Sequence, residues 1–150
     1  ASAVDVFRGG KEIRLPAAEC GFGYRTSGFM PGDFVTGAAF ALTRREPEKI
    51  MEVQRGYNRR RALTQPKGRS AGCVFRRVGE VSAAYYIDRA GLKGERAGGA
   101  FVSELHAGFI LSDGTATAKD VMTLIKRIEE RVREKFGIAL ERELRIIGEL

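Results

Sequence analysis

A short run of small residues around Cys73 is the part of the sequence best suited to chemistry. The run Ser70-Ala71-Gly72-Cys73-Val74-Phe75 follows the dipeptide Gln65-Pro66 and precedes a Gly91-Leu92-Lys93-Gly94 turn. Its small residues leave room for a ligand to approach the backbone, and Cys73 has the only side chain in the run with a proton to give near neutral pH. The sequence therefore predicts a loop on which a thiol meets a bound ligand.

The chain is strongly basic, which favours anionic partners. It has 26 Lys and Arg against 19 Asp and Glu among 150 residues, a formal net charge of +7. Such an excess fits nucleic-acid phosphates or a smaller anionic substrate, and a solvated helix face remains the ordinary alternative for any single residue. Several basic residues gather in sequence on the approach to Cys73: Arg59, Arg60, Arg61, Lys67, Arg69, Arg76 and Arg77.

Two classes of function are disfavoured by what the sequence lacks. A sheet that binds RNA needs paired exposed aromatic residues, and no aromatic-glycine signature of that kind occurs, so a basic nucleic-acid-binding module is the weakest alternative. His106 is the single histidine and has no Cys or carboxylate at ligand spacing, so no metal site is expected. Cys20, in an apolar setting, is expected to be a small buried hydrophobic residue.

The composition is typical of a globular domain, with 43% hydrophobic and 30% charged residues. No apolar run approaches the ~20 residues that a membrane-spanning helix needs. The first residues lack the basic start and apolar stretch of a signal peptide, and two cysteines are too few for a secreted disulfide scaffold. We therefore expect a cytoplasmic protein whose cysteines are thiols in a reducing compartment.

Hydrophobic periodicity and turn residues predict alternating strands and helices. The predicted strands cover residues 3–7, 11–15, 34–42, 73–76, 100–103 and 108–111, with a Gly9-Gly10 turn after the first and a short helical piece at 17–20. The predicted helices cover residues 47–63 and 82–90, followed by a last helix and a C-terminal strand. In that strand, alternation would place Leu144 and Ile146 on one face and Glu143 and Arg145 on the other.

The last helix has the clearest sequence pattern. Thr117 is expected to cap it, with Asp120 reaching back, and Gly137 is expected to end it. Apolar residues recur at helical spacing and predict a core stripe: Val121, Ile125, Ile128 and Val132. Glu129 lies four residues before Arg133, which predicts an exposed supporting ion pair.

Several motifs follow one another along the chain. They are Gly23-Tyr24-Arg25-Thr26-Ser27, residues 61–66, the Cys73 run, Gly91-Leu92-Lys93-Gly94, and residues 98–110, 116–121 and 140–148. In this order and spacing, the motifs resemble the UDP-N-acetylenolpyruvoylglucosamine reductases, flavoenzymes that make UDP-N-acetylmuramate for bacterial cell walls. The resemblance implies reduction of UDP-N-acetylglucosamine enolpyruvate with FAD and NADPH as cofactors.

The resemblance implies three catalytic side chains. Arg25 matches the arginine that steadies the substrate carboxylate and the developing enolate, a task suited to a fixed guanidinium fork. Glu143 matches the acidic partner at the enolate; Glu141 replaces it if the register is off by two, and a surface ion pair with Arg145 is the alternative. Cys73 matches the proton donor, where relatives carry serine, and a thiol with a reference pKa of ~8.5 is the stronger acid.

Further residues are implied at the cofactor and the substrate. The cofactor-binding positions match Arg25, Ser27 and Arg145, and the substrate-binding positions match Lys93, His106, Arg77 and Arg61. Lys93 can meet a phosphate as a point charge, whereas His106 fits either a hydrogen bond to substrate or a structural role. Arg77 stands where the family usually has the asparagine of Lys-Asn-Pro, so substrate contact there departs from the family pattern.

The resemblance also implies an α+β fold with two parts. Residues 1–46 would be the strand-rich tail of an FAD-binding domain, and residues 47–150 a substrate-binding domain of helices on a small mixed sheet. Relatives extend further before Ala1, where glycine-rich segments cradle the FAD pyrophosphate, and no Gly-x-Gly-x-x-Gly occurs here. We expect a C-terminal part that is inactive alone, with the missing N-terminal half as a partner.

The short connection between Arg25 and Pro66 indicates the subgroup without a long substrate flap. A nucleotide-sugar binding domain without redox activity is the alternative.

Overall fold

The computed structural model describes residues 1–148 and divides into two compact units. Unit 1 is Ala1–Ile50 and unit 2 is Met51–Leu150. Helix α1 (Pro47–Thr64) crosses the boundary between them in sequence, and every one of its residues is exposed. Within the described residues, no helix combines the length and the apolar character needed to cross a membrane.

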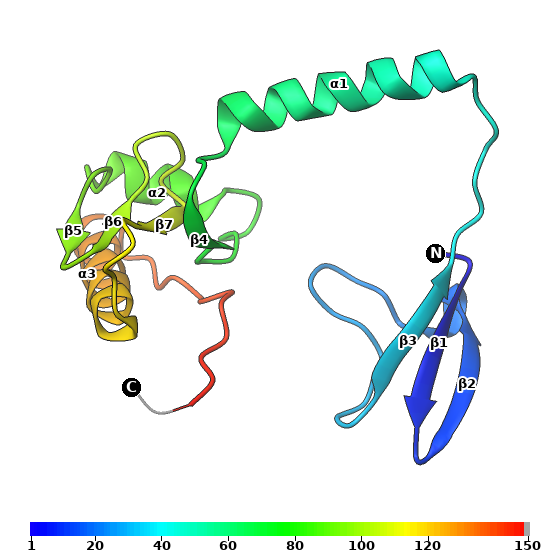
Figure 1. The fold of residues 1–150 in the computed structure, drawn as a ribbon. Helices are drawn as coiled ribbons and strands as arrows, with labels where there is room; N and C mark the ends of the chain where they lie inside the picture. Colours follow the sequence, from blue (N-terminus) through cyan, green and yellow to red (C-terminus); the bar gives the residue numbers. More distant parts are fainter. Residues whose placement is uncertain (149–150) are drawn as a thin grey trace. The chain divides into compact units, whose positions relative to one another are not determined.

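Unit 1 is a three-stranded antiparallel sheet in the order β2-β1-β3 (Figure 1). Strands β1 (Ala3–Arg8) and β2 (Lys11–Pro16) are joined by the predicted Gly9-Gly10 turn, in which both glycines have positive φ, as a tight hairpin requires. A short 3-10 helix, Ala17–Glu19, follows at the predicted place. Strand β3 (Phe34–Ala39) is shorter than predicted because its pairing ends at Ala3, the first residue of β1.

The core of unit 1 is small. Alternation along β1 buries Val4 and Val6, and these pack with Cys20, which is fully buried as predicted. These are the buried hydrophobic residues of this unit, whereas Phe7, Phe34 and other large apolar side chains remain exposed. A unit of this length with so little core needs further contacts to be stable.

Unit 2 packs helices on a four-stranded sheet in the order β4-β7-β6-β5. Its strands are β4 (Arg69–Cys73), β5 (Arg96–Ala97), β6 (Ala100–Val102) and β7 (Phe109–Ser112), and its helices include α2 (Ala83–Arg89) and α3 (Ala118–Phe136). This arrangement confirms the α+β class, but all strand pairs in the sheet are antiparallel, whereas a mixed sheet was predicted.

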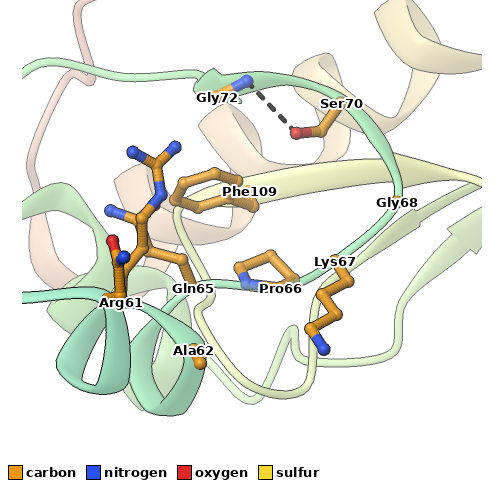
Figure 2. A pocket seen from close by; sticks show the side chains of 10 residues that line it. Arg61, Ala62, Gln65, Pro66, Lys67, Gly68, Ser70, Gly72 and Phe109 are labelled. Carbon is orange, nitrogen blue, oxygen red and sulfur yellow. Dashed lines mark hydrogen bonds between the residues drawn. The ribbon is translucent and has the colours of Figure 1, made fainter. Parts of the chain in front are cut away.

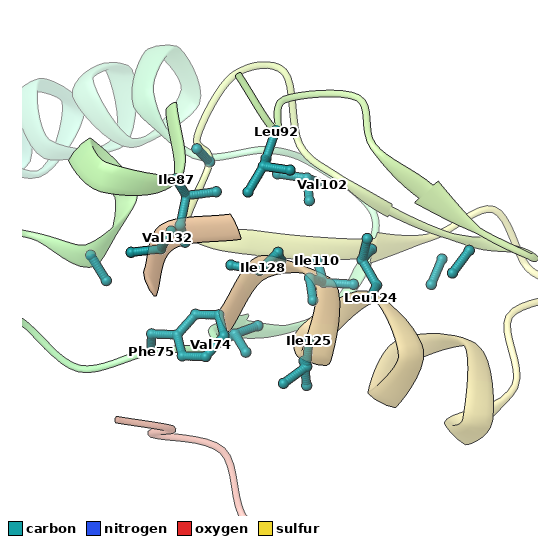
Figure 3. Packing of buried hydrophobic residues seen from close by; sticks show 14 residues of the cluster. Val74, Phe75, Ile87, Leu92, Val102, Ile110, Leu124, Ile125, Ile128 and Val132 are labelled. Carbon is teal, nitrogen blue, oxygen red and sulfur yellow. The ribbon is translucent and has the colours of Figure 1, made fainter. Parts of the chain in front are cut away.

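Helix α3 confirms the predicted cap, apolar stripe and terminal glycine. The Thr117 hydroxyl accepts from the Asp120 N–H (3.2 Å), the Asp120 carboxylate accepts from the Thr117 N–H (2.9 Å), and Gly137 ends the helix with φ 68°. Its apolar stripe lies in the main core (Figure 3). The buried residues of that core are Val74, Phe75, Ala83, Ile87, Leu92, Ala97, Ala100, Val102, Ala107, Ile110, Leu124, Ile125, Ile128 and Val132.

Three sequence predictions for unit 2 are wrong. The strand predicted at residues 73–76 lies earlier, as β4, because Arg69 to Cys73 pair with β7 and the chain then leaves the sheet. The predicted C-terminal strand is reduced to an isolated bridge between Phe75 and Arg142. Glu129 makes a two-pronged ion pair with Arg142 in place of the predicted pair with Arg133. The short strand β5 was not predicted.

Candidate functional site

The Cys73 run lies between two other segments that carry predicted site residues. The Val74 N–H donates to the Gly108 carbonyl (2.9 Å), and the Val74 carbonyl accepts from the Glu143 N–H (2.8 Å). Cys73 itself pairs with Phe109 in the β4–β7 register. The structure therefore brings Cys73, Glu143 and the His106 loop together on adjoining backbone segments, although they are far apart in sequence.

A local irregularity in β4 shapes the backbone before Cys73. The pairing register shifts between Ser70 and Cys73, and Gly72 has a φ of 83°, a conformation that favours glycine. The Gly72 N–H donates a hydrogen bond to the Ser70 hydroxyl oxygen (3.3 Å). This bulge leaves Cys73 exposed at the end of the strand, where a ligand can reach the thiol.

A pocket of about 530 Å³ lies beside this bulge (Figure 2). It is lined by Asn58, Arg61, Ala62, Gln65, Pro66, Lys67, Gly68, Ser70, Gly72 and Phe109. Arg61 and Lys67 give it positive charge, and Gly68 and Gly72, which have no side chains, allow a ligand to approach the backbone closely. Because Phe109 is the register partner of Cys73, the pocket adjoins the thiol and suits an anionic ligand.

His106 is oriented by contacts within its own loop. Its Nδ1 accepts from the Gly108 N–H (3.1 Å), so in this arrangement the ring proton is assigned to Nε2. The ring packs edge-on against Phe109, with centroids 4.9 Å apart. Buried Ser103 holds the same loop, because its hydroxyl accepts from the N–H groups of Leu105 and His106 (3.2 Å each).

Lys93 lies in the predicted Gly-Leu-Lys-Gly turn but is already paired. Its ammonium lies 2.8 Å from the Asp88 carboxylate, and both side chains are partly exposed. Gly94 has a φ of 76°, a left-handed conformation that other residues rarely adopt, so the turn favours glycine. A phosphate at Lys93 would have to share or displace the contact with Asp88.

Two predicted arginines of unit 2 lie apart from these contacts. Arg77 donates to the Glu80 carbonyl and lies 3.1 Å from the Glu80 carboxylate, in the turn closed by the bridge between Val78 and Val81. Arg145 is exposed, two residues beyond Glu143.

Arg25 and Ser27 belong to unit 1, on an exposed loop after Cys20. Gly23 and Thr26 pair across a tight turn, and Arg25 in that turn has a φ of 57°, the left-handed region that non-glycine residues rarely adopt. Its guanidinium lies 5.7 Å from the centre of the Tyr24 ring. Such a strained residue is typical of a functional position.

The sequence did not single out some of the residues that shape this site. Ser103 and Phe109 occur in a matched motif, but only the fold shows that one supports the His106 loop and the other lines the pocket. Lys67 was found through the local excess of basic residues. Among residues 1–148, no group of three His, Cys, Asp or Glu side chains could hold a metal ion.

Known proteins share this sequence and fold. Residues 64–147 match the family model of the UDP-N-acetylenolpyruvoylglucosamine reductase C-terminal domain. A curated reductase of that name from Geobacter metallireducens is 41% identical over 143 residues, which cover 95% of this chain and 48% of the relative. One from Exiguobacterium sibiricum is 41% identical, over 99% of this chain and 49% of the relative.

A solved structure of a reductase of the same name has a similar fold. The crystal structure of UDP-N-acetylenolpyruvylglucosamine reductase from Thermus caldophilus matches with a TM-score of 0.82 and 41% identity, over 95% of this chain and 52% of that one. The chain thus spans about half the length of the curated relatives it matches.

Proposed function

Because the chain belongs to the UDP-N-acetylenolpyruvoylglucosamine reductase family, we propose that it forms the substrate-binding part of such an enzyme. The reaction is the reduction of UDP-N-acetylglucosamine enolpyruvate to UDP-N-acetylmuramate in peptidoglycan synthesis. The observation that carries this proposal is the meeting of Cys73, Glu143 and the His106 loop beside a basic pocket. The domains proposed are residues 1–46, the tail of the FAD-binding domain, and residues 47–150, the substrate-binding domain.

Three side chains of this chain have proposed roles in the reduction. The cofactors FAD and NADPH, when bound, supply the hydride that is added to one carbon of the enolpyruvyl double bond. The Cys73 thiol gives its proton to the other carbon, and its exposure leaves it open to substrate. Arg25 holds the substrate carboxylate and the charge that develops beside it. Glu143, half-buried next to Val74, is the proposed acidic partner at the enolate.

The basic pocket is proposed to hold the diphosphate of the substrate. Arg61 and Lys67 line it directly, and Lys93 and His106 are the further proposed contacts to the substrate. Arg77 is a weaker candidate because its guanidinium is engaged by Glu80. Ser27 and Arg145 are the remaining proposed contacts to FAD, together with Arg25.

The small core of unit 1 supports a further partner for the chain. Large apolar side chains such as Phe7, Phe34 and Val35 are exposed on this unit, and its buried hydrophobic residues are few. A second protein segment would cover such surfaces. We propose that this segment is the N-terminal, flavin-binding half that the relatives contain.

Calorimetric titration of the chain with UDP-N-acetylglucosamine enolpyruvate tests the pocket. We expect binding that weakens as salt concentration rises, because two cations contact the diphosphate. Arg61→Gln should weaken binding roughly tenfold, the worth of one charge-assisted contact. Arg59→Gln is the matched control, because Arg59 lies on the same helix and does not line the pocket.

Three results would contradict the proposal. Equal effects of the Arg59 and Arg61 substitutions would place the nucleotide sugar elsewhere. Binding of duplex DNA with a steep salt dependence, together with no binding of the nucleotide sugar, would favour the nucleic-acid alternative. Binding of the sugar without any reduction once the N-terminal half is supplied would leave only a nucleotide-sugar binding domain.

A further inference from the structure

The residues around Glu143 are fixed by an ion pair that the sequence pattern did not predict. Arg142 donates from Nε and Nη2 to the two carboxylate oxygens of Glu129, at 2.6 and 2.8 Å. We propose that Glu129 and Arg142 are positioning residues that set the direction in which Glu143 faces. This inference rests on the proposed role of Glu143 in the reaction.

Two backbone hydrogen bonds join the segment that holds Glu143 to the run after Cys73. The Arg76 N–H donates to the Glu141 carbonyl (2.8 Å), and the Glu143 N–H donates to the Val74 carbonyl (2.8 Å). These two bonds flank the isolated bridge between Phe75 and Arg142, and no longer ladder forms among the described residues. Two hydrogen bonds do not strongly define a register, so side chains must do so.

The bridge geometry determines which way each side chain points. Phe75 and Arg142 are directly opposite each other in an antiparallel pair, so their side chains lie on the same face. Phe75 is buried in the core that α3 covers, which places Arg142 on the side of Glu129 in α3. Because successive side chains in an extended segment alternate, Glu143 is directed to the other face.

A slip of one residue would reverse this arrangement. It would turn Glu143 toward α3 and move Arg142 to the opposite face, away from Glu129. The ion pair opposes the slip because both side chains are largely covered, with 34% of Arg142 and 20% of Glu129 exposed. The hydrogen bond with Glu129 raises the pKa of Arg142, a guanidinium that is already charged at every ordinary pH.

The other ion pair on this segment is a weaker restraint. Arg76 and Glu141 meet at 2.7 Å, but 40% and 69% of their side chains are exposed, so water and salt screen the contact. Leu140 and Leu144 pack against the core on either side of the bridge and hold the segment near α3. Because Leu140 and Leu144 share the face of Arg142, a slip of one residue would turn them away from the core, so they oppose it together with the ion pair of Arg142 and Glu129.

Amide hydrogen exchange on the whole chain, followed by NMR, tests the positioning role. In Glu129→Gln we expect the amides of Glu143 and Arg76 to exchange roughly tenfold faster, while amides in the middle of α3 keep their protection. Glu130→Gln is the matched control, since Glu130 is the next residue of α3 and is exposed. The reversed pair Glu129→Arg with Arg142→Glu should restore slow exchange. Unchanged exchange at Glu143 in Glu129→Gln would overturn the inference.

Activity assays with the N-terminal half supplied separate this inference from the proposed function. Glu129→Gln should lower kcat with little change in KM, and the reversed pair should recover much of the loss. If Glu143→Gln leaves kcat unchanged, the catalytic role of Glu143 fails even when the exchange result holds. If Glu143→Gln lowers kcat but Glu129→Gln does not, Glu143 is catalytic and the positioning role is wrong.

Discussion

At the scale of single residues, the proposed role of Cys73 as proton donor depends on the acidity and placement of its thiol. A thiol ionises more readily than a hydroxyl, so a cysteine in place of serine remains a competent proton donor. The bulge at Gly72 leaves the side chain exposed, and the neighbouring backbone is held on both sides by Gly108 and Glu143. A donor on such a fixed segment needs little rearrangement to reach a bound substrate.

Substitutions at Cys73 can separate proton donation from packing. With the N-terminal half supplied, Cys73→Ala should slow substrate reduction by roughly 10² to 10⁴-fold, the usual worth of a general acid, without affecting flavin reduction by NADPH. Cys73→Ser should recover much of that rate in the same stopped-flow assay. Equally mild effects in both variants would mean that Cys73 only packs, and that Glu143 or water is the donor.

Arg25 offers a test of strain at a candidate catalytic residue. Its φ of 57° disfavours any side chain, so Arg25→Gly should stabilise the folded turn by about 1 kcal/mol relative to Arg25→Ala, which keeps the strain. Urea unfolding followed by NMR signals of unit 1 measures this difference. Both variants should lose reductase activity in the complete enzyme. Equal unfolding midpoints for the two variants would show that the turn relaxes without cost.

At the scale of secondary structure, locally encoded elements were predictable and non-local ones were not. Helix α3 carries its cap, its stripe and its terminal glycine within one stretch of sequence, so its bounds followed directly. The segment that holds Glu143 is different, because its conformation depends on Val74 and on Glu129, which lie elsewhere in the chain. The alternating pattern at residues 143–147 suggested a strand, but within residues 1–148 the segment pairs only through the isolated bridge between Phe75 and Arg142.

In the candidate site, too, the features encoded by one stretch of sequence were predictable, and the features that join distant stretches were not. The small residues around Cys73 predicted a loop, but Arg69–Cys73 form strand β4, and it is the register shift at Gly72 that leaves Cys73 exposed. The pocket, by contrast, joins the end of α1 to β4 and β7, so only the fold shows that Arg61 and Phe109 share it. The ion pair of Lys93 and Asp88 could not be predicted from the sequence either, because two charged residues five positions apart around a turn have no characteristic distance.

The ion pair of Arg8 and Asp33 joins the end of β1 to the segment before β3 and gives unit 1 a pH dependence. The hydrogen bond from Arg8 lowers the pKa of Asp33 to about 2. Because the folded-state pKa is below the ordinary Asp value of ~3.9, the pair stabilises unit 1 above that value and is lost as pH falls toward 2.

The Arg8 Nε–H resonance reports this titration directly. It should keep its hydrogen-bonded shift down to about pH 2 and lose it below, whereas in Asp33→Asn it should show no such change. A midpoint near the ordinary Asp pKa would show that the pair is not formed. The ion pair of Arg14 with Asp5, on the neighbouring strands, serves as an internal comparison.

At the scale of the whole molecule, the two units differ in the size of their hydrophobic cores. Unit 2 surrounds α3 with a continuous set of buried side chains, whereas unit 1 buries Val4, Val6 and Cys20. Exposed apolar residues on unit 1 include Phe22, Tyr24, Met30, Phe34, Val35 and Phe40. Surfaces of this kind are unfavourable in water and fit the proposal that another half of the protein covers them.

This difference predicts that the chain does not unfold in one step. In a urea titration followed by separate NMR signals, unit 1 should lose its structure at a lower urea concentration than unit 2, because fewer buried side chains oppose its unfolding. Adding the N-terminal half of a reductase should raise the midpoint of unit 1, since a partner that binds only the folded state stabilises it by mass action. The midpoint of unit 2 serves as the internal control and should move less. Coincident transitions in the chain alone would mean that unit 1 draws its stability from contacts within this chain, and the proposed need for a second half would then lose its structural basis.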